Sequence, residues 1–159
     1  MKKILVLVAV AALSISLVSC NKSSIKPGNL TTEYHQDAFT DAVSPFSGEA
    51  SPRFSWINKG RRQGAAQTGF QLRVFMDTAE HGQILLWDVT HEDPVGTVSF
   101  LVPYEGCPLK PCSDYYWQVK VKDEKGNWSS WSQTCHFHTG MLGQDLWQAQ
   151  WIGAPWQGE

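Results

Sequence analysis

Short runs of alternating apolar and polar residues recur along the chain from Pro52 onward, with turn residues between them. A period of two places successive side chains on opposite faces of a β-strand, so each run predicts a strand with one buried face. The closely spaced turns favour antiparallel pairing, and the pattern as a whole predicts an all-β fold, an antiparallel β-sandwich. The predicted strands lie near residues 54–56, 70–76, 84–89, 98–104, 115–122 and 135–138.

A tyrosine opens one of these strands after the segment Leu109-Lys110-Pro111-Cys112-Ser113-Asp114. This arrangement resembles the tyrosine corner of Greek-key sandwiches, in which the ring packs in the core and the hydroxyl bonds to the upstream backbone. Tyr115 is therefore the candidate corner residue. We expect a fibronectin type III-like or immunoglobulin-like sandwich over residues 45–140.

The first residues have the features of a lipoprotein signal peptide. Two lysines precede an apolar stretch that is too short to span a bilayer comfortably. Leu17-Val18-Ser19-Cys20 then resembles a bacterial lipobox, in which the cysteine is acylated after cleavage. We expect residues 1–19 to be removed and Cys20 to be the lipidation site. The protein would then lie in the cell envelope, held to the membrane by its lipid anchor. The alternative is an ordinary secretion signal.

The segments that flank the predicted sandwich have their own character. Residues 20–44 are polar and have no apolar period, so we expect a flexible tether that lifts the domain from the membrane. Residues 141–159 contain Trp147, Trp151 and Trp156, which is unusually apolar for a chain end. We interpret this second segment as a linker into a further domain.

The charge balance excludes one large class of function. The chain has 13 basic and 15 acidic residues, and removal of residues 1–19 would leave 11 and 15. No basic field is available to bind nucleic acid, so we expect no nucleic-acid partner. His136 and His138 share one strand face, a spacing compatible with metal binding, but a solvated strand edge is the preferred interpretation. We expect no metal and no cofactor.

Five motifs of the chain belong together: Pro52-Arg53-Phe54-Ser55-Trp56, Leu86-Trp87-Asp88-Val89, Tyr116-Trp117-Gln118-Val119, Trp128-Ser129-Ser130-Trp131-Ser132 and Asp145-Leu146-Trp147-Gln148. Together they resemble the N-terminal sandwich domain of bacterial α-L-rhamnosidases, over about residues 50–155. The resemblance implies a non-catalytic accessory domain, a spacer or docking unit, of a secreted inverting glycoside hydrolase. The catalytic carboxylates of that family lie in a large (α/α) barrel far downstream, so the chain would be truncated before it and its partners would be the downstream domains.

The acidic pairs do not change this expectation. Inverting glycosidases need two carboxyl groups about 6.5–9.5 Å apart across a pocket. Glu92-Asp93 and Asp123-Glu124 are sequence neighbours in predicted turns, so we interpret them as solvated turn charges. We expect no catalytic residue and no enzyme activity from this chain alone.

Two tryptophans suggest an alternative function, the binding of carbohydrate. Trp128 and Trp131 follow the strand that carries Lys120 and Lys122, and this motif is also similar to the signature of cytokine-receptor sandwich domains. The lysines are expected to stack on the indoles, at about 0.5–1 kcal/mol for each exposed contact. The same indoles would serve as a platform for a sugar in a free-standing carbohydrate-binding or adhesion module. Such a module would bind glycans, those that contain rhamnose among them.

The remaining candidates are thiols and a basic loop. Cys107 and Cys112 flank a short prolyl loop, and a disulfide between them is expected outside the cytoplasm. Pairing of Cys112 with Cys135 is the alternative to Cys135 as a buried thiol. Lys59, Arg61 and Arg62 form a hydrophilic loop for which contact with another domain or with anionic headgroups is the second interpretation.

Overall fold

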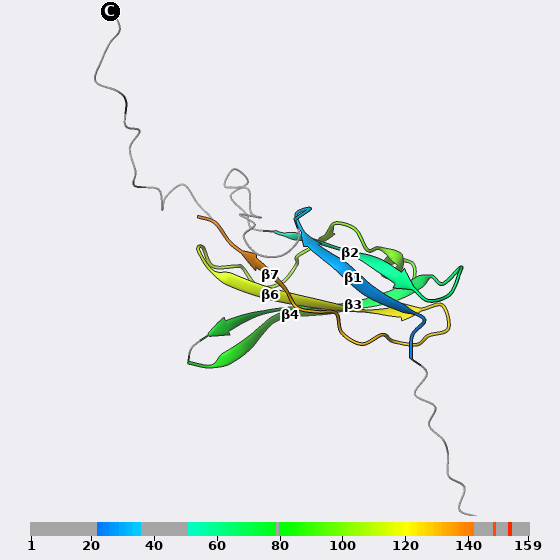
Figure 1. Ribbon diagram of the computed structural model, residues 1–159. Coiled ribbons are helices and arrows are strands. Elements are labelled where there is room, and N and C mark those ends of the chain that lie inside the picture. Colours follow the sequence, from blue (N-terminus) through cyan, green and yellow to red (C-terminus); the bar gives the residue numbers. More distant parts are fainter. Residues whose placement is uncertain (1–21, 36–50, 79, 142–147, 149–152, 154–159) are drawn as a thin grey trace, which may run out of the picture.

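Two antiparallel sheets face each other in the computed structural model, which describes residues 22–35, 51–78, 80–141, 148 and 153 (Figure 1). One sheet has the strand order β1-β2-β5 and the other has the order β4-β3-β6-β7. The predicted antiparallel β-sandwich is therefore confirmed. The elements are β1 (Ile25–Thr32), β2 (Arg53–Gly60), β3 (Gln67–Thr78), β4 (Gly82–Glu92), the 3-10 helix η1 (Val95–Thr97), β5 (Val102–Pro103), β6 (Asp114–Asp123) and β7 (Cys135–His138).

The core follows from the alternation that predicted the strands. Every second residue of β6 is buried, from Tyr115 to Asp123. The ring centres of Phe54 on β2 and Trp117 on β6 lie 4.7 Å apart, so aromatic side chains join the two sheets at the centre. Trp117 also donates its indole N–H to Thr32 Oγ1 at 3.0 Å, which satisfies its polar atom in the core.

The prediction of a tether over residues 20–44 is wrong for residues 25–32, which form β1. This strand is paired with β2 from Ile25 opposite Gly60 to Thr32 opposite Phe54, with a register shift between Gly28 and Thr31. Its alternation is weak, and only its first and last residues are buried. The pairing is thus set by backbone hydrogen bonds to β2 and not by a local apolar period. Residues 36–44 lie outside the described residues.

The predicted strand at 98–104 is mostly irregular. Only Val102 and Pro103 form a strand, whereas Val98 is 43% exposed and Phe100 is 61% exposed. Leu101 has φ +53°, a left-handed conformation that interrupts an extended backbone. The segment still follows β2, because Trp56 N donates to Ser99 O at 2.9 Å.

The chain joins and leaves the sandwich at opposite ends of β6. Ser24, before β1, donates its backbone N–H to Asp123 Oδ2 at 2.9 Å at the last residue of β6. His138, the last residue of β7, is paired with Asp114 at the first residue of β6. β6 has ten residues, and at about 3.3 Å per residue its two ends are about 30 Å apart. Figure 1 shows the start of β1 and the end of β7 at opposite ends of the sandwich.

Candidate functional site: an aromatic–cation face and its supports

Five side chains form a stacked row on the outer face of the β3–β6 sheet, which we call the Trp–cation ladder: Arg73, Lys120, Lys122, Trp128 and Trp131. Lys120 Nζ lies 5.0 Å from the ring centres of both tryptophans, so it sits between them. Lys122 Nζ lies 5.7 Å from the ring of Trp128. The guanidinium of Arg73 lies 4.2 Å from the ring of Trp131. Indole and cation thus alternate along the face.

The serines beside the tryptophans attach this segment to β6. Ser129 N donates to Val121 O at 2.8 Å, and its Oγ accepts the N–H of Val121 at 3.0 Å. Ser132 makes the same pair of bonds with Val119, at 2.8 Å and 3.1 Å. Ser129 and Ser132 are three positions apart, and the residues of β6 that they bond to, Val121 and Val119, are two positions apart. The indoles are therefore held at a fixed separation over the cations.

Arg73 is the ladder member that the sequence analysis missed. It lies on β3, 47 positions before Lys120 in the sequence, and becomes its neighbour only through pairing of β3 with β6. Its Nε and Nη2 donate to Gln118 Oε1 at 3.0 Å and 2.5 Å. Gln118 in turn donates to Thr134 Oγ1 at 3.0 Å. A polar partner thus fixes the guanidinium over the indole, which a single strand's sequence does not reveal.

The ladder arrangement favours a structural role over a sugar platform. A sugar stacks on an open aromatic face, but Trp128 and Trp131 are both half-buried and have cations over their rings. Lys120 occupies the space between the two indoles. The five side chains therefore hold the segment 128–132 against β3 and β6.

A double-mutant cycle measures the contact between Arg73 and Trp131. Replacement of Arg73 by Ala, of Trp131 by Ala and of both is expected to give a coupling free energy of about 1 kcal/mol, because the pair is partly shielded from solvent. Urea unfolding of the four proteins measures it. A cycle between Arg73 and Trp128 is the control, since the guanidinium of Arg73 stacks on Trp131. Equal coupling in both cycles would contradict the assigned stacking order.

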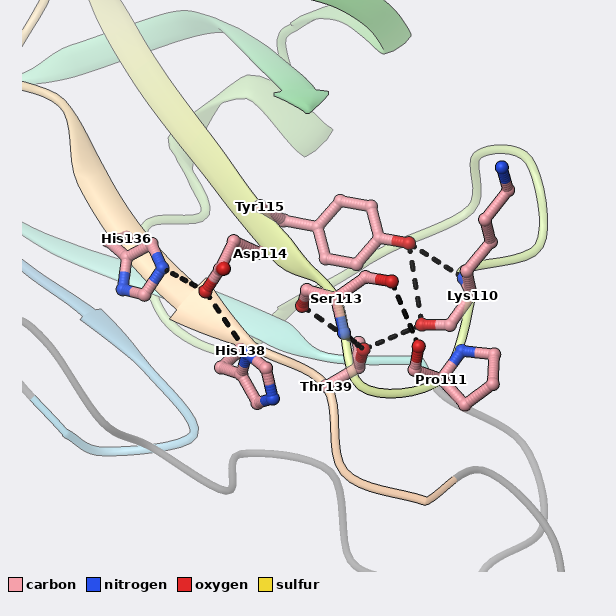
Figure 2. Close-up of polar contacts among 8 residues, drawn as sticks. All are labelled: Lys110, Pro111, Ser113, Asp114, Tyr115, His136, His138 and Thr139. Carbon is pink, nitrogen blue, oxygen red and sulfur yellow. Dashed lines mark hydrogen bonds and ion pairs between the residues drawn. The ribbon is translucent and has the colours of Figure 1, made fainter. Parts of the chain in front are cut away.

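Figure 2 shows the corner at the start of β6. Lys110 N donates to the Tyr115 hydroxyl at 2.7 Å, which is the tyrosine-corner geometry. The Tyr115 ring is stacked on Phe137 of β7 with ring centres 5.3 Å apart. Thr139 closes the corner, because its Oγ1 donates to Lys110 O at 2.6 Å and accepts the N–H of Ser113 at 3.0 Å. The loop before β6 is thereby fixed to the end of β7.

Tyr115→Phe tests the corner. The ring still packs on Phe137, but the backbone N–H of Lys110 loses its acceptor, so we expect a loss of about 1–2 kcal/mol in the free energy of unfolding. Tyr116→Phe on the other face of β6 is the matched control, with no change expected beyond about 0.5 kcal/mol. Chemical denaturation followed by tryptophan fluorescence compares them. Equal stability of both variants would remove the structural role of the Tyr115 hydroxyl.

An aspartate that the sequence analysis did not place lies beside the two histidines of β7. His136 Nε2 and His138 Nδ1 lie 2.8 Å and 3.0 Å from the same atom, Asp114 Oδ1 (Figure 2). Hydrogen bonds from His138 and His136 lower the pKa of Asp114 below its usual value. Within the described ranges no group of three or more His, Cys, Asp or Glu side chains is arranged to hold a metal ion. We interpret the three residues as a clamp between β6 and β7.

Asp123 corrects the interpretation of 123–124 as solvated turn charges. It is 1% exposed and accepts the N–H groups of Ser24, Lys125 and Asn127 at 2.9–3.0 Å. Burial alone raises the pKa of Asp123, but the hydrogen bonds from Ser24, Asn127 and Lys125 outweigh it and set the pKa at about 2. Asp123 therefore joins the turn after β6 to the segment before β1.

Two more of the acidic residues considered in the sequence, Glu92 and Glu124, pair with cations. Glu92 Oε1 accepts from Lys122 Nζ at 2.7 Å. Glu124 pairs with Arg62. These carboxylates therefore neutralise neighbouring charges of the domain.

The structure does not contain the Cys107–Cys112 disulfide. Both thiols are exposed and separate. Their backbones are held by different neighbours, because Cys107 O accepts the Tyr104 hydroxyl at 2.7 Å and Cys112 N donates to Gly140 O at 3.1 Å. Cys135 is buried in the core at 3% exposure and is not joined to Cys112.

Other predictions fall on residues that the structure does not describe. The lipidation site Cys20 and the tryptophans at 147, 151 and 156 are among them. Among the described residues, no helix has the length and apolar character that crossing a membrane requires.

The two-sheet fold, the tyrosine corner and the Trp–cation ladder define an immunoglobulin-like β-sandwich. The model of the family described as "Rha78A-like, N-terminal immunoglobulin domain" matches residues 27–143. The chain belongs to this family. The match begins inside β1, which agrees with the correction of the predicted tether.

Individual relatives agree with the family. An α-L-rhamnosidase of Streptomyces avermitilis is 39% identical over 109 residues, which cover 67% of this chain and 10% of the relative. One from Formosa agariphila is 29% identical over 147 residues, 88% of this chain and 15% of the relative. The crystal structure of the Streptomyces avermitilis enzyme complexed with L-rhamnose matches with a TM-score of 0.67 and 33% identity, over 82% of this chain and 12% of that one.

The chain thus spans about a tenth to a seventh of the length of these relatives. The matching part is the N-terminal immunoglobulin domain and not the catalytic barrel. The expectation that this chain is a non-catalytic part of an α-L-rhamnosidase-like architecture is therefore confirmed at the level of the domain.

Proposed function

We propose that the chain acts as the N-terminal spacer and docking domain of an α-L-rhamnosidase-like glycoside hydrolase of the cell envelope. The observation that carries this proposal is the match of residues 27–143 to the N-terminal immunoglobulin domain of a family whose α-L-rhamnosidase relatives match this chain over only 10–15% of their length. Its work is mechanical: it keeps a fixed distance and orientation between the segment before β1 and the segment after β7.

The geometry of the two ends supports a spacer. The chain joins the sandwich near Asp123 and leaves it near Asp114, at opposite ends of β6. Both ends are fixed by hydrogen bonds, through Ser24 at one and through Thr139 at the other. A rigid sandwich about 30 Å long, with the chain fixed at both ends, sets the distance and the orientation between the segment that precedes it and the segment that follows it.

An exposed aromatic pair supports docking at the C-terminal end. Tyr34 and Phe100 are each 61% exposed, and their ring centres lie 6.0 Å apart in an edge-to-face contact. Tyr34 lies two residues beyond Thr32, on the side toward which the chain leaves. An apolar pair of this exposure is a suitable contact for a neighbouring domain.

A domain exchange tests this function. In the Streptomyces avermitilis relative, deletion of the segment that matches this chain is expected to lower the thermal unfolding temperature and leave the barrel's kcat within a few-fold. Residues 22–141 of this chain in its place are expected to restore part of the lost stability. The same exchange with Tyr34→Ser and Phe100→Ser is expected to restore less. An exchange that restores nothing, with the sandwich folded, would contradict the docking role.

We further propose that Cys20 is acylated and anchors the chain in the cell envelope. The lipobox-like Leu17-Val18-Ser19-Cys20 supports this. In bacteria fed radiolabelled palmitate, the chain is expected to carry label and to fractionate with membranes. Cys20→Ser is expected to abolish the label, and Cys107→Ser is expected to leave it unchanged. Label that persists in Cys20→Ser would contradict the assignment.

A further inference from the structure

A basic groove lies at the end of the sandwich where the chain joins it. The groove has a volume of about 820 Å³ and runs between β1, the end of β2 and the segment before β7. Its lining includes the four cations Lys22, Lys26, Lys59 and Arg61, and none of the described residues that line it is Asp or Glu. We call this set the basic groove.

The four cations have no acidic partner among the described residues. Two carboxylates near this end have partners other than these cations: Asp123 accepts the backbone N–H groups of Ser24 and Asn127, and Glu124 pairs with Arg62. Lys26 and Lys59 are directly opposite each other across β1 and β2. Two like charges at opposed positions on one sheet face repel, so this pair weakens the fold. An external anion would relieve that repulsion.

The position of Lys22 in the sequence indicates which anion would lie close to the groove. Ser23 N donates to Trp128 O at 3.4 Å, and Arg61 N donates to Ser24 O at 3.0 Å, so the segment that begins at Lys22 is attached to the domain. Cys20 is only two residues before Lys22. Covalent geometry therefore keeps its Cα within about 7 Å of that of Lys22. A lipid on Cys20 would bring the bilayer to this end of the sandwich.

We propose that the basic groove is a docking surface for the anionic headgroups of the membrane that holds the chain. This inference rests on the lipid anchor proposed above. It replaces the expectation of a domain lifted off the bilayer, since residues 22–24 leave no free spacer. The groove then orients the sandwich, with its C-terminal end directed away from the membrane.

Charge supports a local and oriented contact. The chain without residues 1–19 has 11 basic and 15 acidic residues, so as a whole it is repelled by an anionic bilayer. Four clustered cations overcome this only when the groove faces the surface, because screening limits each attraction to about 10 Å at 0.1 M salt. Each lysine near such a surface contributes about fivefold to partitioning.

Vesicle sedimentation of an unacylated chain tests the groove. The chain begins at residue 20 with Cys20→Ser and contains both complete sheets. We expect binding to vesicles of phosphatidylcholine with phosphatidylglycerol, little binding to phosphatidylcholine alone, and a decline with added NaCl. Lys26→Gln and Lys59→Gln are each expected to weaken partitioning about fivefold, and the double variant about 25-fold. Lys110→Gln, an exposed lysine at the other end, is expected to change it less than twofold.

Two further readouts separate this proposal from its rivals. Because Lys26 and Lys59 oppose each other, both Gln variants are expected to unfold at an equal or higher urea concentration, which shows that weaker binding is not misfolding. Equal loss with Lys110→Gln would overturn the proposal in favour of a net-charge effect. Chemical-shift changes with inorganic phosphate but no vesicle binding would overturn it in favour of a soluble anion. Since this chain lacks the anchor, a negative result leaves the palmitate test of Cys20 unaffected.

Discussion

Trp117→Ala is expected to destabilise the domain by about 4 kcal/mol, more than any other substitution considered. Trp117 is fully buried at the centre of β6, and its ring packs on Phe54 of the opposite sheet at 4.7 Å. Truncation removes the largest of the fully buried side chains in the described residues and leaves a cavity that the strands on both sides fill only in part. Guanidinium unfolding followed by circular dichroism measures the change.

Thr32→Val separates packing from hydrogen bonding in this effect. Valine keeps the shape of threonine but removes the acceptor of the Trp117 indole N–H, so we expect a loss of about 1–2 kcal/mol. Trp117→Phe is expected to be intermediate between Thr32→Val and Trp117→Ala. A loss below about 1 kcal/mol for Trp117→Ala would mean that the two sheets do not meet at this residue.

Asp123→Asn is expected to destabilise the domain by about 2–3 kcal/mol at pH 7 and to remove part of its acid sensitivity. The carboxylate accepts four hydrogen bonds, from the N–H and hydroxyl of Ser24 and from the N–H groups of Lys125 and Asn127. An asparagine amide group turns a donor toward donors at one of the two oxygen positions.

The pH dependence of the contribution of Asp123 to stability follows from the lowering of its pKa in the folded protein. The pKa of Asp123 is about 2 in the folded protein, against an ordinary value of 3.8. The unfolded chain therefore binds the proton first as pH falls, so this contribution is complete above about pH 4 and is lost as pH falls through about 2. Urea titrations from pH 7 to 2 measure it.

Two variants test whether Asp123 causes this acid dependence, one at Asp123 itself and one at a control position. In Asp123→Asn the fall in stability between pH 4 and 2 is expected to be smaller by roughly 1.8 kcal/mol. In Asp77→Asn, which changes an exposed carboxylate on β3, the fall is expected to match that of the unaltered protein. The same acid dependence in all three proteins would show that Asp123 does not join the turn to β1.

The strands that the sequence predicted are those whose burial alternates. β6 has a buried residue at every second position because its face toward the sandwich interior is fully covered, whereas the indoles of the Trp–cation ladder cover its outer face only in part. β1 escaped prediction because it lies at a sheet edge and buries only Ile25 and Thr32. Its pairing comes from backbone groups that every residue carries, which leaves no trace in an apolar pattern.

The site residues divide in the same way. Trp128, Trp131, Lys120 and Lys122 belong to one hairpin, so their spacing in the sequence predicts contact and the structure shows it. Arg73 and Asp114 meet their partners only across strand pairs. Asp123 looked like an exposed turn charge, because its burial depends on Ser24, 99 positions earlier. Long-range contact of this kind has no local signature.

This chain is a structural domain, and its described polar clusters hold the sandwich together and do not cleave a glycoside. The most direct test is the release of nitrophenol from 4-nitrophenyl α-L-rhamnoside by the purified chain, over a range of chain concentrations. We predict release at the rate of buffer alone at every concentration. A rate that rises in proportion to the chain and vanishes when the chain is unfolded in urea would contradict the claim.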